Sequence, residues 1–264
     1  MNDIPEIKLG TILFSLAEPK PGHEREYNRW YERDHFFAGC MVGANYFSGR
    51  RWVATKPLKA LRFPADTPIV DDIARGSFLH TYWILDGAYS ETLRWSVDQV
   101  VQLFKQKRME PPRDNISSGY YRYDWGVFRD TDGVPPELAL EHPYQGVGTL
   151  MIDKATGASA EALSGWLKAH LAKAMTGSPA AMTLCLRPEP LPDDAPGNVP
   201  RPDPADLENR TLLLMFLEAE PRAAWPEFAA GLDRALIESG LGRVIHAASF
   251  IPTVPGTDRY IDEL

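Results

Sequence analysis

The chain has 264 residues, a length that suits one large domain or two of about 130 residues each. Hydrophobic residues make up 44% of it and charged residues 24%, which is typical of a folded globular protein and excludes a disordered chain. The net charge of −8 comes without any basic run, which argues against a nucleic-acid partner.

Nothing in the sequence indicates a membrane or secreted protein, so we expect a cytoplasmic one. No run of about 18 apolar residues is present, and the N-terminal stretch lacks the apolar segment of a signal peptide. The two cysteines, Cys40 and Cys185, are too few for a disulfide framework and have no zinc-type spacing. We interpret both as buried thiols in a reducing compartment.

The first half of the chain predicts the element order β-α-β-β-α-β. Its strands are short apolar runs rich in β-branched and aromatic residues, and its helices show apolar residues at helical spacing. The strands are expected at residues 8–15, 42–53, 79–85 and 120–128. The helices are expected at residues 23–37 and 89–107.

The second half predicts the same order again. Its strands are expected at residues 146–153, 180–186, 211–217 and 244–254. Its helices are expected at residues 159–175 and 224–239. Pro226 would lie near the first turn of the last helix, where proline is tolerated, and Gly240 would end that helix.

Three features indicate an internal repeat. Gly10-Thr11 and Gly148-Thr149 open corresponding strands at an offset of 138, and Trp30 and Trp166 lie mid-helix at an offset of 136. Each half also has a proline-rich connection between its second and third strands. We interpret the second one, residues 188–209, as a surface excursion rather than an interdomain linker.

A β-α-β-β-α-β unit is ferredoxin-like, with two helices on one face of a four-stranded antiparallel sheet. The other face of each sheet needs cover, and two units in one chain can cover each other. The predicted fold is therefore α+β, with two tandem ferredoxin-like repeats packed sheet to sheet as an intrachain α+β barrel. We place the repeats at residues 1–135 and 136–264. The sequence leaves open whether the barrel pairs further into a homodimer.

The helix expected at residues 23–37 has a polar and aromatic face. Asn28, Tyr31 and His35 are spaced i, i+3, i+7 and share that face, with Trp30 beside it. An imidazole can take and return protons near neutral pH, and a tyrosine hydroxyl can donate to a developing oxyanion. The alternative is that His35 merely interacts with the helix dipole and that Tyr31 is a boundary residue.

These residues resemble the dimeric α+β barrel superfamily, and its EthD-like branch in particular. The likeness covers roughly residues 10–54 and rests on Tyr27-Asn28-Arg29-Trp30-Tyr31, on His35, and on the following strand with Arg50-Arg51. The rest of the chain follows the superfamily only in element order.

The resemblance implies a pocket between the sheet and the helices, with His35 as the motif histidine and Trp30 and Tyr31 as its aromatic partners. Relatives include cofactor-free monooxygenases, polyketide cyclases, lactone isomerases, dehydratases and haem-binding lyases, so the fold does not decide the reaction. Phe36-Phe37 departs from the commonest form of the motif, which implies a reshaped pocket entrance.

Several strand residues are candidates for binding a substrate in such a pocket. They are Arg50, Arg51, His80, Tyr82, Tyr121 and Tyr123, together with Trp30 on the helix. Because neighbouring strand residues point to opposite faces, only one of Arg50 and Arg51 can face inward, where it could hold a carboxylate or enolate. Packing inside the barrel is the alternative for the tyrosines.

The second repeat lacks the polar face of the first. Alignment on Trp166 places Leu171 at the position of His35, and His170 at the position of Asp34. We therefore expect one active pocket per chain, with the degenerate second repeat completing the barrel.

The leading hypothesis is a cofactor-independent enzyme that acts by acid–base chemistry on a small hydrophobic, aromatic or polyketide-like compound. A lyase, dehydratase, isomerase or cyclase reaction fits, with His35 moving the proton and with Tyr31 and Asn28 stabilising negative charge. Nucleotide-binding, nucleophile-elbow and paired-histidine zinc motifs are absent from the sequence.

Two groups of alternatives stay open. One is a cofactor-free monooxygenase or a haem-binding enzyme of the same fold, since haem ligation needs only one histidine. The other is a non-catalytic small-molecule-binding or stress-response module, which predicts that His35 lies exposed on a convex surface.

Overall fold

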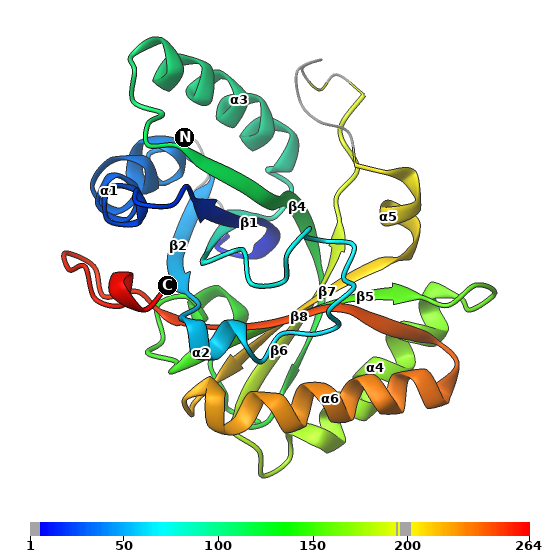
Figure 1. Ribbon diagram of the computed structural model, residues 1–264. Coiled ribbons are helices and arrows are strands. Elements are labelled where there is room, and N and C mark those ends of the chain that lie inside the picture. The colour runs from blue at the N-terminus through cyan, green and yellow to red at the C-terminus, as the bar shows by residue number, and fades with distance from the viewer. Residues whose placement is uncertain (1–5, 194, 196–201) are drawn as a thin grey trace.

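The computed structural model describes residues 6–193, 195 and 202–264, so part of the second proline-rich connection lies outside the described residues. Within these ranges the strands form a closed barrel in the order β1-β3-β2-β8-β5-β7-β6-β4 (Figure 1). Every neighbouring pair is antiparallel. The predicted α+β fold, with the β-α-β-β-α-β order followed twice, is confirmed.

The first repeat contains four strands and two principal helices. The strands are β1 (Leu9–Pro19), β2 (Tyr46–Val53), β3 (Phe78–Leu85) and β4 (Arg113–Phe128). The helices are α1 (Glu24–Trp30), which continues as π-helical turns at Tyr31–His35 and Phe37–Met41, the short α2 (Lys56–Lys59) and α3 (Tyr89–Lys105).

The second repeat has the same layout. Its strands are β5 (Gly146–Lys154), β6 (Ala180–Pro188), β7 (Arg210–Leu217) and β8 (Gly242–Pro252). Its helices are α4 (Ala160–Met175), the short α5 (Pro204–Asn209) and α6 (Pro221–Ser239). Single 3-10 turns occur at Pro136–Leu138 and Ile261–Glu263.

Several boundaries differ from the sequence expectation: β1 continues to Pro19 instead of ending at residue 15, and β2 begins at Tyr46 instead of residue 42. Two further differences have clear reasons. Helix α6 begins at Pro221, so Pro226 lies inside the helix rather than in its first turn. Strand β4 begins at Arg113, because its first residues still pair with the end of β1. Gly240 ends α6 as predicted, in the left-handed conformation at φ 70° that glycine adopts without strain.

The barrel interior is filled by apolar side chains from both repeats. Trp52 on β2 and Trp83 on β3 pack at 6.2 and 6.4 Å from the ring of Phe216 on β7. The indole N–H groups of both tryptophans are satisfied, by Thr81 Oγ1 and by the carbonyl of Pro136. The two sheets thus bury their inner faces against each other.

The helices cover the outer faces of the barrel (Figure 1). Helices α4 and α6 lie over the second repeat, where α4 buries Leu163, Leu167, Leu171 and Met175 at helical spacing. Helices α1 and α3 lie on the side of the first repeat. Among the described residues, none of the helices is long and apolar enough to cross a membrane.

The seam between β2 and β8 is short, and the first proline-rich connection extends it. Trp52 and Val53 are the residues of β2 that pair with β8. Phe63, in the connection at residues 55–77, pairs with Ala247 of β8, whose amide donates to the Phe63 carbonyl at 2.7 Å. This connection therefore helps to close the barrel.

Gly148 tests the packing of α6 on the barrel. A Cβ at this position would come within 1.9 Å of the ring of Trp225, which is fully buried, so the ring or the strand would have to shift. We expect Gly148→Ala to lower the free energy of unfolding by about 1–3 kcal/mol, measured by urea denaturation.

Gly231→Ala is the matched control, because no atom lies within 4 Å of a Cβ at Gly231 in the interior of α6. Alanine there should raise the free energy of unfolding by about 0.5–1 kcal/mol. A Gly148→Ala protein as stable as the wild type would contradict the close approach of Trp225 to β5.

Candidate active site

A cluster of polar aromatic side chains lies between the π-helical stretch and the outer face of β3, with Tyr31 at its centre. The Tyr31 ring stacks on the ring of His80 at 3.7 Å between centroids and meets the ring of His35 edge-on at 5.0 Å. The Tyr82 hydroxyl donates to the Tyr31 hydroxyl at 3.1 Å. Tyr31, His80 and Tyr82 are all buried.

Strand alternation places His80 and Tyr82 in this cluster. On β3 their neighbours Leu79 and Trp83 point into the barrel core, so the even-numbered residues face the helices. On the adjacent strand, a Cβ at Gly49 would lie 2.7 Å from the Tyr82 ring, so the glycine provides the space that the phenol occupies.

The π-helical geometry brings His35 beside its aromatic partners. In a π-helix, residues five apart lie one above the other, and the rings of Trp30 and His35 stack at 4.5 Å with an interplanar angle of 16°. In the regular helix α4, Trp166 and His170 stack at 4.6 Å and 16° over a spacing of four. The structural counterpart of His35 is therefore His170, and the alignment that pairs His35 with Leu171 is wrong by the one residue that the π-turn adds.

The absence of a side chain at Gly39 leaves the space that the His35 ring occupies. A Cβ at Gly39 would lie 2.8 Å from His35 Cε1. His35 is largely buried there, against the ring of Trp30, and the guanidinium of Arg113 lies 4.5 Å from the same indole ring. The Trp30 indole N–H donates to the carbonyl of Arg108 at 2.8 Å, which fixes the ring in place.

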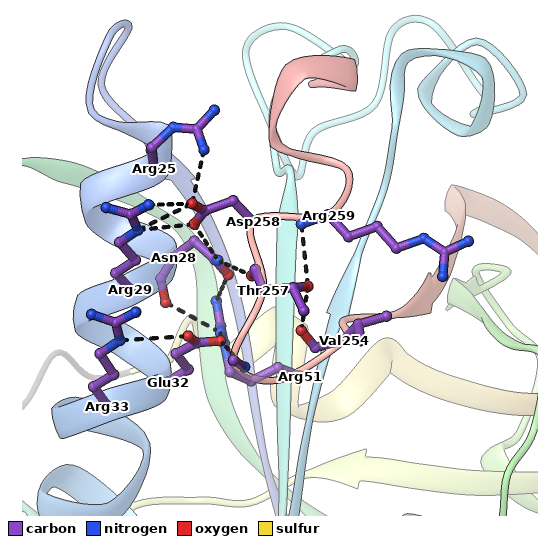
Figure 2. A network of polar contacts seen from close by, with 11 residues as sticks. Arg25, Asn28, Arg29, Glu32, Arg33, Arg51, Val254, Thr257, Asp258 and Arg259 are labelled. Atoms are coloured by element: carbon purple, nitrogen blue, oxygen red, sulfur yellow. Dashed lines mark hydrogen bonds and ion pairs between the residues drawn. The ribbon is translucent and has the colours of Figure 1, made fainter.

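Arg51 is the arginine that faces the cluster, which decides between the two arginine candidates. Its guanidinium lies 4.9 Å from the Tyr31 ring and donates to the backbone oxygen and to Oδ1 of Asn28 at 3.3 and 3.1 Å (Figure 2). Arg50 points to the other face, over the ring of Trp52 at 4.8 Å. Arg51 is 5% exposed, and it forms an ion pair with Glu32 at 3.9 Å.

Asn28 does not reach the histidines in this arrangement. Its Nδ2 donates to the carbonyl of Thr257 at 3.0 Å, while its two oxygens accept from Arg51. The expected common face of Asn28, Tyr31 and His35 is thus divided: Asn28 holds Arg51, and the other two contact each other.

The tyrosines expected from β4 lie elsewhere. Tyr121 points into the barrel, with its ring 6.0 Å from that of Phe14, and Tyr123 packs on the same core. The structure does not bring either of them to His35. Tyr120 is the β4 tyrosine on the helix side.

Tyr27 is a member of the cluster that the sequence reasoning missed. Its ring lies 5.6 Å from Tyr31 and 6.2 Å from His80. The signal was present in the sequence, because Tyr27 precedes Tyr31 by one helical turn.

Burial keeps both histidines neutral at pH 7. Desolvation, helped by the positive charge of Arg113, lowers the pKa of His35 to about 4. Desolvation and the charge of Arg51 hold the pKa of His80 well below its usual value. Desolvation also raises the pKa of Tyr31, so its hydroxyl keeps its proton. His80 Nδ1 lies 3.3 Å from the carbonyl of Ser15, and this contact assigns its proton to Nδ1 and a free lone pair to Nε2.

Four polar atoms in this cluster are buried without a hydrogen-bond partner among the described residues. They are Tyr27 Oη, His35 Nδ1, Arg51 Nε and His80 Nε2. Their side chains all surround the ring of Tyr31. A buried polar atom without a partner is costly, so such a concentration is typical of a place where a ligand or water binds.

A pocket of about 340 Å³ adjoins the cluster at Arg51. Its wall includes Glu32, Phe36, Phe37, Leu140 and Pro255. The ring of Phe36 lies 5.4 Å from that of Tyr82 and separates the pocket from the phenols. The Phe36-Phe37 pair therefore lines the pocket nearest the cluster.

Comparison with known proteins gives a likeness of fold. No model of a known protein family matches the chain, and no curated protein matches its sequence. A "putative chlorite dismutase" is similar over 97% of this chain and 100% of its own, with a TM-score of 0.58 and 11% identity. A "putative monooxygenase" from Fusobacterium nucleatum is similar over 94% and 95%, with a TM-score of 0.52 and 8% identity. A haem-binding protein from Thermus thermophilus covers 94% and 93% at a TM-score of 0.47 and 11% identity. The chain therefore shares its fold, an α+β barrel of ferredoxin-like units, with these two solved structures of TM-score above 0.5.

The space at Gly39 sets the environment of His35. In Gly39→Ala the new methyl group would displace the imidazole toward solvent. Since burial is the main cause of its low pKa, about 4, we expect that pKa to rise toward the ordinary value of about 6.5. An NMR titration of the imidazole measures it, with His35→Gln to assign the signal.

Gly165→Ala, in open surroundings on α4, is the control and should leave the His35 titration unchanged. A pKa that stays near 4 in Gly39→Ala would show that the ring does not depend on this space.

The neutral histidines make folding depend on pH. Between pH 6.5 and about 4 the unfolded chain binds a proton at residue 35 and the folded chain does not, so stability falls as the pH drops through this window. The contribution of His35 is roughly 3 kcal/mol. Urea unfolding of wild type and His35→Gln at pH 7 and pH 4.5 measures it. A difference between the two proteins that does not change with pH would contradict a neutral, buried His35.

Proposed function

We propose that this chain is an enzyme that carries out acid–base chemistry on a small hydrophobic, aromatic molecule at the cluster around Tyr31. The observation that carries this proposal is that four side chains, each with an unpartnered buried polar atom, lie around the ring of Tyr31: Tyr27, His35, Arg51 and His80. An acceptor, a hydroxyl donor and a cation in one dry place are the groups that proton transfer next to a carbonyl requires.

Each side chain has a distinct part in the proposed reaction. A substrate C–H proton passes to the free Nδ1 of His35, and the electron pair moves onto the substrate carbonyl oxygen to form an enolate. Tyr31, whose oxygen already accepts from Tyr82, donates its own hydroxyl proton in a hydrogen bond to that oxygen. Arg51 supplies positive charge that stabilises the enolate. Return of the proton to another carbon completes an isomerisation, and loss of a leaving group completes an elimination. In a cyclisation the enolate carbon forms a bond to a second carbonyl carbon of the same substrate, and His35 returns the proton to the resulting alkoxide.

His80 and Asn28 support this set. His80 has a free Nε2 on the ring stacked against Tyr31, which makes it the second proton acceptor of the site. Asn28 acts through Arg51, whose guanidinium it holds, and is a positioning residue. Trp30 and Phe36 give the surroundings an aromatic character that suits a planar substrate.

The two repeats have different roles in this proposal. Residues 1–135 carry the cluster around Tyr31, and residues 136–264 complete the barrel, with an apolar helix layer in place of the polar cluster. The second range also adds Leu140, Thr253 and Pro255 to the wall of the adjoining pocket. The Trp30, Tyr31 and His35 arrangement supports placement in the EthD-like branch. Cys40 and Cys185 are both buried and unpaired, which supports a reducing compartment such as the cytoplasm.

Haem does not fit the described histidines. An axial ligand needs a ring nitrogen that faces a space large enough for the macrocycle. The His80 ring is covered by Tyr31 at 3.7 Å, and neither the 340 Å³ pocket nor the neighbouring 440 Å³ pocket at residues 50, 144 and 259 has a histidine in its wall. We therefore assign no step to haem.

A cofactor-free monooxygenase is the second candidate. The same groups that stabilise an enolate would present a carbanion to molecular oxygen, which would serve as the oxidant. The fold shared with the Fusobacterium protein is compatible with this chemistry. Oxygen uptake during turnover distinguishes the oxygenase from a lyase or isomerase.

Deuterium exchange tests the acid–base proposal without knowledge of the final product. A panel of aryl ketones and unsaturated lactones is incubated in D₂O with the protein, and exchange of C–H next to the carbonyl is followed by mass spectrometry and oxygen uptake by electrode. We expect His35→Gln to slow this exchange by about 10²–10⁴-fold, because it removes the proton acceptor. Tyr31→Phe should slow it by a smaller factor, because it removes one hydrogen-bond donor to the enolate oxygen.

His170→Gln is the matched control, because His170 stacks on a tryptophan in the same way but lies outside the cluster. The His170→Gln protein should exchange the substrate C–H for deuterium at the wild-type rate. Equal rates in wild type and His35→Gln would contradict the proposed role of the histidine.

A further inference from the structure

The segment that follows β8 crosses from the second repeat to the first helix of the first repeat (Figure 1). We call residues 253–264 the strap. Its contacts with the helix are mainly polar. Asp258 accepts from Arg25 at 2.8 Å and from Arg29 Nε at 3.1 Å (Figure 2). The amide of Gly256 donates to Glu32 at 3.1 Å. The strap thus binds along the outer side of α1 and the π-turn.

The residues that hold the strap also hold Arg51. Asn28 donates to the carbonyl of Thr257 in the strap and accepts from Arg51 (Figure 2). Glu32 accepts from Gly256 in the strap and lies 3.9 Å from Arg51. Movement of the strap would therefore break one hydrogen bond of each of the two side chains that contact the buried guanidinium.

The strap also forms part of the pocket beside the cluster. Thr253 and Pro255 lie in the wall of the 340 Å³ pocket, together with the first-repeat residues Phe36 and Phe37. The connection between α3 and β4 contacts the π-helical stretch separately, through the ion pair of Arg108 with Asp34. The 340 Å³ pocket thus reaches Arg51 from the strap.

The cluster is closed in this structure. His80 is 0% exposed and Tyr31 5%, so a ligand reaches them only if a covering segment moves. The sheet is held by continuous ladders and the helices by apolar packing. The strap, by contrast, contributes one buried apolar residue, Ile261, with Tyr260 and Leu264 only partly buried beside it. Its ion pairs come from arginines that are about half exposed, and such contacts open at a low free energy.

We propose that residues 253–264 are a gate over the site, latched by Asp258 on Arg25 and Arg29, and that a ligand enters through the 340 Å³ pocket when the strap lifts. This inference rests on the proposed function of the cluster. It makes the second repeat more than a scaffold, because the chain that leaves its last strand controls entry to the site of the first repeat.

Chemical modification of His80 tests the gate. Diethyl pyrocarbonate acylates a neutral imidazole at a free nitrogen, and His80 Nε2 is such an atom. The modification rate of His80 is measured by peptide mass spectrometry, with His170 as internal reference, and hydrogen exchange of the Gly256 amide reports on the strap. In Asp258→Asn we expect both rates to rise about tenfold, with the reference unchanged.

Two variants are matched controls. Asp262→Asn removes the same charge from the same strap, but Asp262 pairs with Arg25 alone among the described residues and is 89% exposed, so both rates should stay within about twofold of wild type. Asp34→Asn removes the ion pair with Arg108 of the α3–β4 connection and leaves the strap contacts in place, so it should leave the His80 rate unchanged.

Three results would overturn the proposal. The first is an unchanged Gly256 exchange rate in Asp258→Asn, which would show that Asp258 is no latch. The second is faster Gly256 exchange with an unchanged His80 rate, which would show that the strap is not the route. The third is a faster His80 rate in Asp34→Asn, which would place the entrance at the α3–β4 connection. None of these rates requires turnover, so the gate and the proposed function are tested separately. If the strap opens as expected but the protein never exchanges substrate protons, the proposed function is refuted and the gate is not.

Discussion

Each four-stranded sheet of this chain has two faces to cover, and its own helices can cover only one. The structure meets this constraint by closing the two sheets into one barrel, so that Trp52 and Trp83 of the first repeat pack on Phe216 of the second. The repeats are neither independent domains nor one open sheet, because each supplies the inner cover of the other. The pairing of Phe63 with Ala247 at the short β2–β8 seam serves the same closure.

Because the shared interior secures the fold, the two outer helix layers can differ. Over the second repeat, α4 buries leucines at helical spacing, and the described residues there form an apolar layer. Over the first repeat, the corresponding layer buries two imidazoles, several phenols and the guanidinium of Arg51, with four polar atoms unpartnered among the described residues. Burial of this kind costs stability. A fold that already has a complete apolar core tolerates that cost, and we infer a functional reason for it.

Much of the architecture follows from the sequence, and part of the cluster does. Hydrophobic periods of 2 and 3.6 residues, interrupted by glycine and proline, were enough to predict the element order and the two-fold repeat. Alternation along β3 placed His80 and Tyr82 on one face. The choice between Arg50 and Arg51 was beyond the sequence, because a bulge between Tyr46 and Ser48 shifts the register of β2. The contact of the strap with the first helix could not be predicted from the sequence either, since the hydrogen-bonded residues Asn28 and Thr257 are 229 residues apart.

The π-turn was the least predictable feature, and the position of His35 depends on it. Both repeats stack a tryptophan on a histidine at nearly the same distance and angle, yet the spacing is five residues in the first and four in the second. A single added residue alters neither composition nor amphipathic pattern enough to be read from one sequence. In the structure it brings His35 over Gly39 and against Tyr31, whereas among the described residues His170 stacks only on Trp166 of an ordinary helix. The difference between the two repeats at this position is thus a local change of helical geometry around a shared pair of residues, which is how π-turns commonly mark functional sites.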